Sequence, residues 1–517
     1  MTALMRSTGR KVSAAATSAG ARWSGGRPGQ RRGNVEGRMK HALMGAGAAL
    51  AMAALAACAV DPAPEPLTGD LLIRDVRTIG FEGETPAIRE HACVLVKDGK
   101  ILAVRDTVEG LSAPDTVDGG GQTLVPGLTD MHVHIWDQAE LGAYLSWGVT
   151  RVRNMSGLPF HLPLAKQIEA GEVMGPHLIT TGPILNSPGP NAQINHQFVE
   201  TADEARAAVA WQAEAGFDRI KVYSNLTRPA YEAIIEEAAA RGMPVSGHTP
   251  EGVREDGMPM EKPFNIAFEE VLADHFETIE HIESVVWHGL RNRHDEDAAR
   301  ALARKIAAED VPVTATLLAH RNLLLVAETE GAATTRPGTD LLNAVEQQTE
   351  GENFAFWAGY DPAPVAEDAA FYARVADIFQ QEGVMLLAGT DAGIFTNIPG
   401  KSLGEELILL TGAGLSPYEA LRSATYSPSV VLGTAGQDGC VEAGCVADLV
   451  LLPCDPLADI ACATEPAGLI YRGAWLDRAA LDALRTDGAV QNVDRTITNV
   501  MGGMAEYGVD VSALMED

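Results

Sequence analysis

The chain has 517 residues, of which 46% are hydrophobic and 21% are charged. At roughly 100–200 residues per domain, this length predicts two to four domains or one large barrel with additions, and the composition excludes a globally disordered, collagen-like or polytopic membrane protein. The formal net charge of −31 comes from 39 basic and 70 acidic residues, so we expect no binding to nucleic acid, whose phosphates would repel this chain.

The first 57 residues differ in charge from the rest of the chain, because they hold nine Lys or Arg residues and one acid, Glu36. Residues 42–57 are an apolar run of 16 residues, which is shorter than the roughly 20 needed to span a membrane and is typical of a signal peptide. We therefore predict a signal region over residues 1–57. Met39 is an alternative start, because Met39-Lys40-His41 would open a signal of ordinary length.

The apolar run ends in Leu55-Ala56-Ala57-Cys58, which resembles a bacterial lipobox. The resemblance implies export, an acylated Cys58 that anchors the protein to a membrane, and a tether over residues 58–67. No Asp directly follows Cys58, which implies an outer-membrane lipoprotein facing the periplasm. A plain secretory signal, which would give a periplasmic protein, stays open.

Short strands are predicted in both flanks of the chain, and the middle alternates short apolar strands with helices. The flank strands are Leu71–Arg74, Ala92–Lys97, Ile101–Arg105, Asp448–Leu452 and Leu469–Arg472. The middle strands are Thr129–Ile135, Thr150–Asn154, His177–Gly182, Arg219–Tyr223, Pro244–His248, Thr278–His281, Pro312–Leu318 and Val384–Asp391. The clearest helices are Ala202–Ala215, Arg228–Arg241 and Asp295–Ala308. Eight such units predict an α/β fold, a (β/α)8 TIM barrel.

Metal-binding side chains gather where these strands end. His132 and His134 are two residues apart in the first strand, so they lie on one face of it. Lys221 lies in the apolar fourth strand, where a buried ammonium needs a partner or a lowered pKa. The fifth, sixth and eighth strands end in His248, His281 and Asp391. The C-terminal ends of barrel strands meet on one face, so the sequence predicts a metal site there.

Several stretches resemble the amidohydrolase superfamily, in its branch of prolidases and imidazolonepropionase-like hydrolases. They are Val125–His134, Ile220–Tyr223, Gly247-His248, Ile279–His281, Ala388–Ala392 and Gly444–Leu452, within residues 68–476. The resemblance implies a TIM barrel with a small β-sandwich built from the two flanks. The expected division is a signal region (1–57), a tether (58–67), the first part of the sandwich (68–126), a metal-binding barrel (127–438), the second part of the sandwich (439–476) and a helical tail (477–517).

The resemblance also implies the cofactors, which are two divalent metal ions, with Zn²⁺ expected. One ion would be held by His132, His134 and Asp391 and the other by His248 and His281. Lys221, carboxylated by CO₂, would bridge both. Imidazole and carboxylate ligands suit Zn²⁺ and also admit Mn²⁺ or Co²⁺. A mononuclear site beside a plain Lys221 stays open.

The implied activity is hydrolysis of an amide bond, as in an Xaa-Pro dipeptidase or an N-acyl amino acid hydrolase. A hydroxide bridging the metals would attack the carbonyl, and Asp391 would pass its proton to the leaving nitrogen. Tyr223 is a candidate for substrate binding and catalysis, because it lies on the same strand face as Lys221. Four further residues are candidates for substrate contact, with a packing or structural role as the alternative to each: Arg153, Asn154, His196 and His320.

Two other functions stay open. One is hydrolysis of a cyclic amide, lactone or phosphoester at the same centre, and the other is a binding lipoprotein without catalysis. The expected partner is a small amide or dipeptide, and assembly into a homo-oligomer is a further option.

Four cysteines cluster near the end of the chain, and an exported compartment permits disulfides. They are Cys440, Cys445, Cys454 and Cys462. The pairs Cys440–Cys445 and Cys454–Cys462 are possible bridges, although spacing alone leaves the connectivity open. Cys93 lies in an apolar run and is predicted to be buried.

Overall fold

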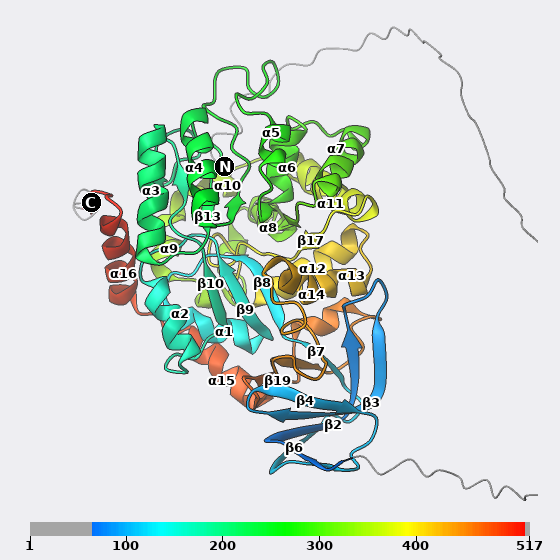
Figure 1. Cartoon of the computed structure of the whole chain (residues 1–517). Helices are drawn as coiled ribbons and strands as arrows, with labels where there is room; N and C mark the ends of the chain where they lie inside the picture. Colours follow the sequence, from blue (N-terminus) through cyan, green and yellow to red (C-terminus); the bar gives the residue numbers. More distant parts are fainter. Residues whose placement is uncertain (1–64, 512–517) are drawn as a thin grey trace, which may run out of the picture. The chain divides into compact units, whose positions relative to one another are not determined.

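The computed structural model describes residues 65–511 (Figure 1). The predicted signal region and the proposed acylation site at Cys58 lie outside this range. Among the described residues, no helix combines the length and apolar character needed to cross a membrane.

The two flanks of the chain share one eight-stranded sheet. Its strands are β2 (Leu71–Gly80), β3 (Ala87–Lys97), β4 (Lys100–Arg105), β6 (Asp115–Asp118), β7 (Thr123–Pro126), β18 (Leu449–Leu452), β19 (Gly468–Tyr471) and β20 (Ala474–Asp477). The order is β20-β19-β18-β7-β2-β3-β4, and β6 pairs with β2. Antiparallel pairing of β7 with β18 joins the two flanks in this sheet.

Both faces of this sheet carry buried side chains. Ile73 and Val94 pack in one apolar cluster with Leu449, whereas Leu72 and Leu95 pack in another. The second cluster includes Leu111 of β5 (Leu111–Ser112), which pairs only with β1 (Leu67–Thr68). The strand pairing therefore shows one large sheet and one small sheet, and the predicted β-sandwich stays a prediction.

Ten strands of the middle region form two parallel sheets. The first has the order β10-β9-β8 and the second has the order β12-β11-β13-β14-β15-β16-β17. Their bounds are β8 (Leu128–Val133), β9 (Val149–Asn154), β10 (His177–Thr180), β11 (Leu185–Asn186), β12 (Gln197–Phe198), β13 (Ile220–Val222), β14 (Val245–Gly247), β15 (Thr278–Glu280), β16 (Val313–Thr314) and β17 (Leu386–Leu387). Each of the eight predicted strands overlaps one of these, and β11 and β12 are additional.

Backbone hydrogen bonds connect the two parallel sheets at both edges. On one side Met131 N donates to Ala388 O (3.0 Å) and His134 N donates to Ala392 O (2.7 Å). On the other side Gly182 N donates to Arg219 O (3.1 Å). These contacts bring the end of β8 against the segment that follows β17.

Sixteen α-helices lie in the described part of the chain. They are α1 (Leu141–Ser146), α2 (His161–Glu169), α3 (Ala202–Ala215), α4 (Arg228–Arg241), α5 (Phe268–Ala273), α6 (Ile282–Gly289), α7 (Glu296–Ala308), α8 (Leu317–Glu328), α9 (Ala344–Thr349), α10 (Gly351–Ala358), α11 (Pro362–Gln381), α12 (Lys401–Ala413), α13 (Pro417–Ser423), α14 (Tyr426–Val431), α15 (Arg478–Gly488) and α16 (Val493–Glu506). The predicted bounds of α3 and α4 are confirmed. Thr201 and Glu204 form a capping box at the start of α3, and left-handed Gly216 ends it.

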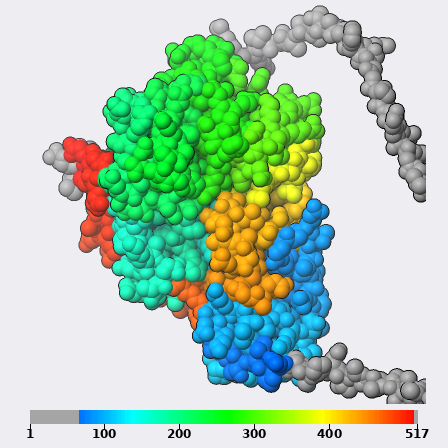
Figure 2. Space-filling view, in the orientation of Figure 1, coloured from blue at the N-terminus to red at the C-terminus, as the bar shows by residue number. Residues whose placement is uncertain are grey.

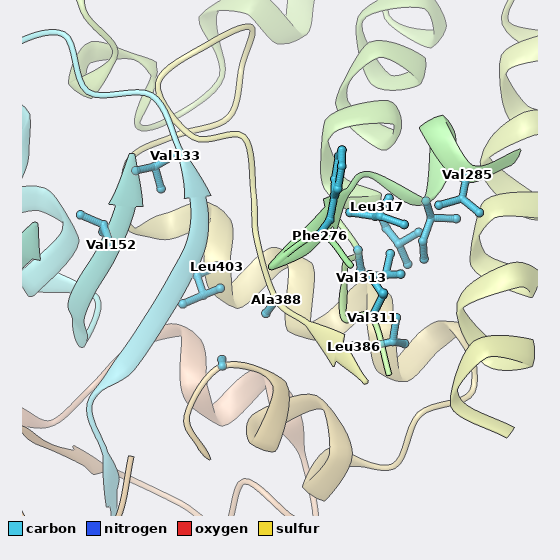
Figure 3. Packing of buried hydrophobic residues seen from close by; sticks show 14 of the residues in the cluster. Val133, Val152, Phe276, Val285, Val311, Val313, Leu317, Leu386, Ala388 and Leu403 are labelled. Atoms are coloured by element: carbon cyan, nitrogen blue, oxygen red, sulfur yellow. The ribbon is translucent and has the colours of Figure 1, made fainter. Parts of the chain in front are cut away.

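The apolar core lies between the parallel strands and their helices (Figure 3). Val313 of β16 and Leu386 of β17 are register partners, and both are buried. Burying one such side chain contributes about 1.5–3 kcal/mol, so neighbouring strands are held by packing as well as by hydrogen bonds.

Two disulfides lie near the C-terminal strands, Cys440–Cys445 and Cys454–Cys462. The predicted local bridging is therefore confirmed, and the connectivity is the one in which neighbours in sequence pair. Cys93 is buried with a free thiol, also as predicted.

Candidate metal centre

The six predicted metal ligands come from five strands of the two parallel sheets. His132 lies in β8 and Lys221 in β13, while His134, His248 and His281 directly follow β8, β14 and β15. Asp391 follows β17 by four residues. All of them are buried except His248, which is partly exposed.

The distances show that these side chains converge. Candidate ligand atoms of His132, His281 and Asp391 all lie within 4.8 Å of one another. His134 Nε2 is 2.9 Å from Asp391 Oδ1, and Lys221 Nζ is 3.2 Å from His132 Nε2. The ring centroids of His248 and His281 are 4.4 Å apart. The structure thus brings all six predicted ligands together.

The protonation of these histidines fits metal binding. Burial lowers the pKa of His132, His134, His248 and His281, and the charge of Lys221 lowers it further. The rings are therefore neutral, which is the form that binds a metal. His134 Nδ1 and His248 Nδ1 are buried and have no hydrogen-bond partner in the described part of the chain. Orphaned buried nitrogens are rare, and neutral imidazoles beside a carboxylate are a donor set that suits a cation such as Zn²⁺.

Lys221 is a fully buried amine. Burial lowers its pKa to about 8, and the charges of Asp391 and Glu280 oppose that shift. A larger fraction of the amine is therefore neutral at physiological pH than for an exposed lysine. The neutral amine is the form that can react with CO₂.

Buried side chains that are not proposed ligands hold the His132 ring through its Nδ1 atom. Its Nδ1 is 2.7 Å from Glu280 Oε2, and Glu280 Oε1 accepts a hydrogen bond of 2.7 Å from Arg153. A carboxylate on the distal nitrogen fixes the ring orientation of a ligating histidine. Asp130 acts similarly on the neighbouring loop, because it accepts hydrogen bonds from the hydroxyl and backbone N–H of Thr390.

Glu280 and Asp130 were not predicted as functional residues from the sequence. The available signal was an acid inside a short apolar strand, where only a paired carboxylate is tolerated. Both acids also stand next to predicted ligands in the chain or two residues from them.

Three of the residues expected to contact substrate have side chains that are already engaged within the protein. Arg153 is fully buried and donates to Met131 O, Glu277 and Glu280, so its guanidinium is engaged within the protein. Asn154 bridges the backbone N–H of Ile135 and the hydroxyl of Thr180.

His320 lies in α8, where its Nε2 donates to Val365 O (3.2 Å) and its ring packs edge-on against Tyr372. These engagements argue against substrate roles for Arg153, Asn154 and His320.

Tyr223 and His196 lie beside the ligand cluster. The ring centroid of Tyr223 is 4.0 Å from that of His248 and 4.9 Å from that of His196. The backbone N–H of Gln193 donates to His196 Nδ1 (3.3 Å), so the proton of this neutral imidazole is on Nε2. His196 Nε2 is buried and has no partner among residues 65–511. It is a donor suited to a substrate oxygen.

Comparison with known families and structures agrees with this geometry. Residues 123–476 match the Amidohydrolase family. A solved Xaa-Pro dipeptidase with methionine bound in its active site is 19% identical, with a TM-score of 0.59, and the match covers 79% of this chain and 99% of that one. Bottromycin amidohydrolase is 25% identical, with a TM-score of 0.64, and covers 81% of this chain and 91% of its own.

Curated relatives match over shorter stretches. L-hydantoinase of Paenarthrobacter aurescens is 37% identical over 68 residues, which are 13% of this chain and 14% of the relative. Imidazolonepropionase of Thermoanaerobacter pseudethanolicus is 32% identical over 79 residues, 13% of this chain and 19% of the relative. The chain therefore matches less than a fifth of the length of these two relatives.

Proposed function

Since the chain belongs to the amidohydrolase family, whose members are generally metal-dependent hydrolases, we propose that it hydrolyses the amide bond of an Xaa-Pro dipeptide or an N-acyl amino acid. The observation that carries this proposal is the convergence of four histidines, a buried lysine and an aspartate at the ends of parallel strands. The similarity to a solved Xaa-Pro dipeptidase and a solved prolidase supports this substrate class.

The proposal includes two finer features of the fold. The first is a closed (β/α)8 barrel, supported by the hydrogen bonds that connect the two parallel sheets at both edges. The second is a β-sandwich formed by the two flanks, supported by the buried side chains on both faces of their sheet. Ligands at the carboxyl ends of the strands would then share one mouth of the barrel.

The proposed cofactors are two divalent cations, with Zn²⁺ expected. His132, His134 and Asp391 would hold one, and His248 and His281 the other. Carboxylated Lys221 would bridge them, because its carbamate replaces a positive charge with one negative charge shared by two oxygens. When bound, the cations would polarise the substrate carbonyl and lower the pKa of the attacking water.

The side chains of the chain would divide the remaining work. Asp391 would accept the proton of the attacking water and donate it to the leaving nitrogen. Burial would raise the pKa of Asp391, but the hydrogen bond from His134 and nearby positive charge, that of Lys221 included, lower it to about 2, so Asp391 is an ionised carboxylate. His196 Nε2 and the Tyr223 hydroxyl would bind substrate oxygens beside His248.

The direct test is metal content and activity on a dipeptide and N-acyl amino acid library, before and after chelator treatment. We expect two cations per chain, turnover of at least one library member, and loss of turnover on chelation that the cation restores. Absence of both metal and turnover would overturn the proposal and would favour a binding protein without catalysis.

A second candidate is hydrolysis of a cyclic amide, favoured by the local similarity to imidazolonepropionase and L-hydantoinase. Lactones and phosphoesters belong to the same test. Product analysis over a panel of linear amides, cyclic amides, esters and phosphoesters separates the two candidates, because only one class should turn over efficiently. Turnover of cyclic amides alone would replace the first candidate.

We also propose that the protein is exported and anchored by a lipid on Cys58, on the strength of Leu55-Ala56-Ala57-Cys58 after an apolar run. We expect the protein in the membrane fraction, with a mature N-terminus at an acylated Cys58. Cys58→Ala should leave it unprocessed or released. A mature chain that starts well before Cys58 in mass spectrometry would contradict the anchor.

A further inference from the structure

Helices α15 and α16 lie beyond the residues that match the family, which end at residue 476. Helix α16 lies at the surface beside α3 (Figures 1 and 2). The ring centroid of Tyr507, directly after α16, is 6.0 Å from that of Trp211 in α3. One side chain of α16, that of Arg495, also contacts the segment that follows β8, a strand of the metal centre.

The strongest contact is an ion pair between Arg495 and Asp137. Arg495 Nε is 2.6 Å from Asp137 Oδ2, and Arg495 Nη2 is 2.5 Å from Asp137 Oδ1. The Asp137 side chain is fully buried, whereas that of Arg495 is 33% exposed. A paired guanidinium fork fixes the carboxylate in orientation as well as in charge. Without Arg495, a buried carboxylate would lose its charge partner.

Asp137 is connected to the metal centre through Trp136. The backbone N–H groups of both residues donate to Glu140, which ties them into one short turn. Trp136 Nε1 donates to Gly393 O (2.9 Å), two residues after Asp391. The Trp136 ring stacks on His134, with centroids 6.4 Å apart and an angle of 16°. The turn that Arg495 holds thus contacts His134 and the loop of Asp391.

Two further contacts attach α16 and the residue after it to neighbouring loops. Asn343 Nδ2 donates to Thr496 Oγ1 (3.0 Å), and both side chains are buried. The Tyr507 hydroxyl donates to the backbone oxygen of Asn195 (2.8 Å), and Asn195 directly precedes His196 in the chain. The extension is therefore attached to three separate segments of the chain, at Asp137, Asn195 and Asn343.

We propose that α16 acts as a clasp, by which we mean that its contacts hold the turn at Trp136 and Asp137 in place. Arg495 is then a positioning residue, which acts through Asp137 and Trp136 on His134. The proposal rests on the proposed function for its kinetic consequence and on the described contacts alone for its structural consequence. If α16 only stabilised the fold, weakening its contacts would lower the melting temperature without a local effect on the Trp136 turn.

The test compares Arg495→Gln with Arg485→Gln in the full chain. Arg485, in α15 of the same extension, lies 3.6 Å over the Trp147 ring and pairs with Glu465 (3.2 Å), so its loss removes the same charge away from the turn. Hydrogen exchange is measured on peptides covering residues 134–140, and kcat and KM are measured on the best substrate. Arg495→Lys and the double variant Asp137→Asn/Arg495→Gln complete the set.

We expect Arg495→Gln to speed exchange in residues 134–140 at least tenfold and to lower kcat/KM at least tenfold, mainly through kcat. Arg485→Gln should do neither. Arg495→Lys and the double variant should recover part of both, because each restores a partner for residue 137.

Unchanged exchange in residues 134–140, or equal acceleration in both single variants, would overturn the clasp. Failure to find any substrate would count against the proposed function and leave the exchange result decisive for the clasp.

Discussion

The His132 ring stands between a buried carboxylate and the ligand cluster. Its Nδ1 is 2.7 Å from Glu280, and its Nε2 is 3.2 Å from Lys221 Nζ. Arg153 holds Glu280 in turn through a hydrogen bond of 2.7 Å. The ring orientation is therefore set from the protein side, and the nitrogen that faces the cluster is available for a cation.

Asp391→Asn tests the proposed proton transfer. The amide has nearly the same shape as the carboxylate but cannot accept the proton, so we expect kcat to fall about 10²–10⁴-fold. Asp438→Asn, which breaks a partly exposed ion pair with Arg151, should retain activity and serves as the control. Steady-state kinetics and metal analysis of both variants check this. Full turnover by Asp391→Asn would remove Asp391 from the mechanism.

Lys221→Ala tests the bridging ligand. We expect it to lose most bound metal and at least 10²-fold in kcat/KM, because the proposed bridging carbamate is lost. Short carboxylic acids should restore part of the activity by filling the gap, whereas Lys401→Ala, at a partly exposed lysine, should behave as the wild type. A crystal structure with an unmodified Lys221 and one fully occupied metal would contradict the binuclear site.

The candidate metal ligands could be predicted from the sequence, but the residues that hold them in place, such as Glu280, could not. His132 and His134 are recognisable because period two places them on one strand face. Arg153 has the same strand-end signal, yet it pairs with Glu280, which is 127 residues away in the chain. Strand position does not tell which buried charges pair, so the pairing of Arg153 with Glu280 could not be predicted from the sequence.

Among the elements, the long helices and the strands that lie inside longer apolar runs were predicted, whereas β11 and β12 were not. The runs in β13 and β14 are apolar with turn signals on both sides, so their positions follow from the sequence, although each is only three residues long. Strands β11 and β12 have two residues each, too few for a periodic pattern. Their hydrogen-bond partners, rather than their composition, make them strands.

One ion-pair network connects β10 to the C-terminal flank and should make stability depend on pH. His177 is 2.8 Å from Asp448 and 2.6 Å from Glu169. Burial alone would lower the pKa of His177, but the hydrogen bonds and charges of these carboxylates outweigh it and raise the pKa above its ordinary value.

The stabilisation from protonated His177 is therefore complete below about pH 6.5, the unfolded-state pKa, and is lost as the pH rises through the higher folded-state pKa. We expect the melting temperature of the wild type to exceed that of His177→Gln most at pH 6 and the gap to narrow at alkaline pH. Thermal melts of both proteins from pH 5 to 9 measure this. A gap that widens with pH would reverse the assignment.

The two disulfides should stabilise the C-terminal flank without supporting the chemistry. They close short loops, with sequence separations of 5 and 8 residues, and loops of this size contribute about 2 kcal/mol each in the chain-entropy account. We expect reduction to lower the melting temperature and leave kcat/KM at the wild-type value below that temperature. A Cys440→Ser/Cys445→Ser double variant separates the first bridge from the second. Loss of activity in the reduced, folded protein would contradict this division.

At the scale of the whole molecule, the sheet of the two flanks and the parallel strands of the middle region both join distant parts of the chain. β7 and β18 pair across more than 320 residues, and Val133 at the end of β8 bridges to Ala392 after β17. The sequence predicts these neighbours only through the resemblance to a known family. Local patterns specify the strands, whereas the order of the strands depends on packing between segments far apart in sequence.

The proposed cations would connect the same distant segments, because their ligands come from β8, β13 and the residues that follow β14, β15 and β17. A ligand that binds only the folded state stabilises it by about 2.7 kcal/mol at 100 times its Kd. Removing the metal should therefore lower the melting temperature of the wild type, and adding Zn²⁺ back should restore it. In Lys221→Ala, which is expected to bind little metal, the chelator should have almost no effect. Differential scanning calorimetry of both proteins, with and without chelator, checks this, and equal melting temperatures for metal-loaded and metal-free wild type would show that the centre does not hold these strands together.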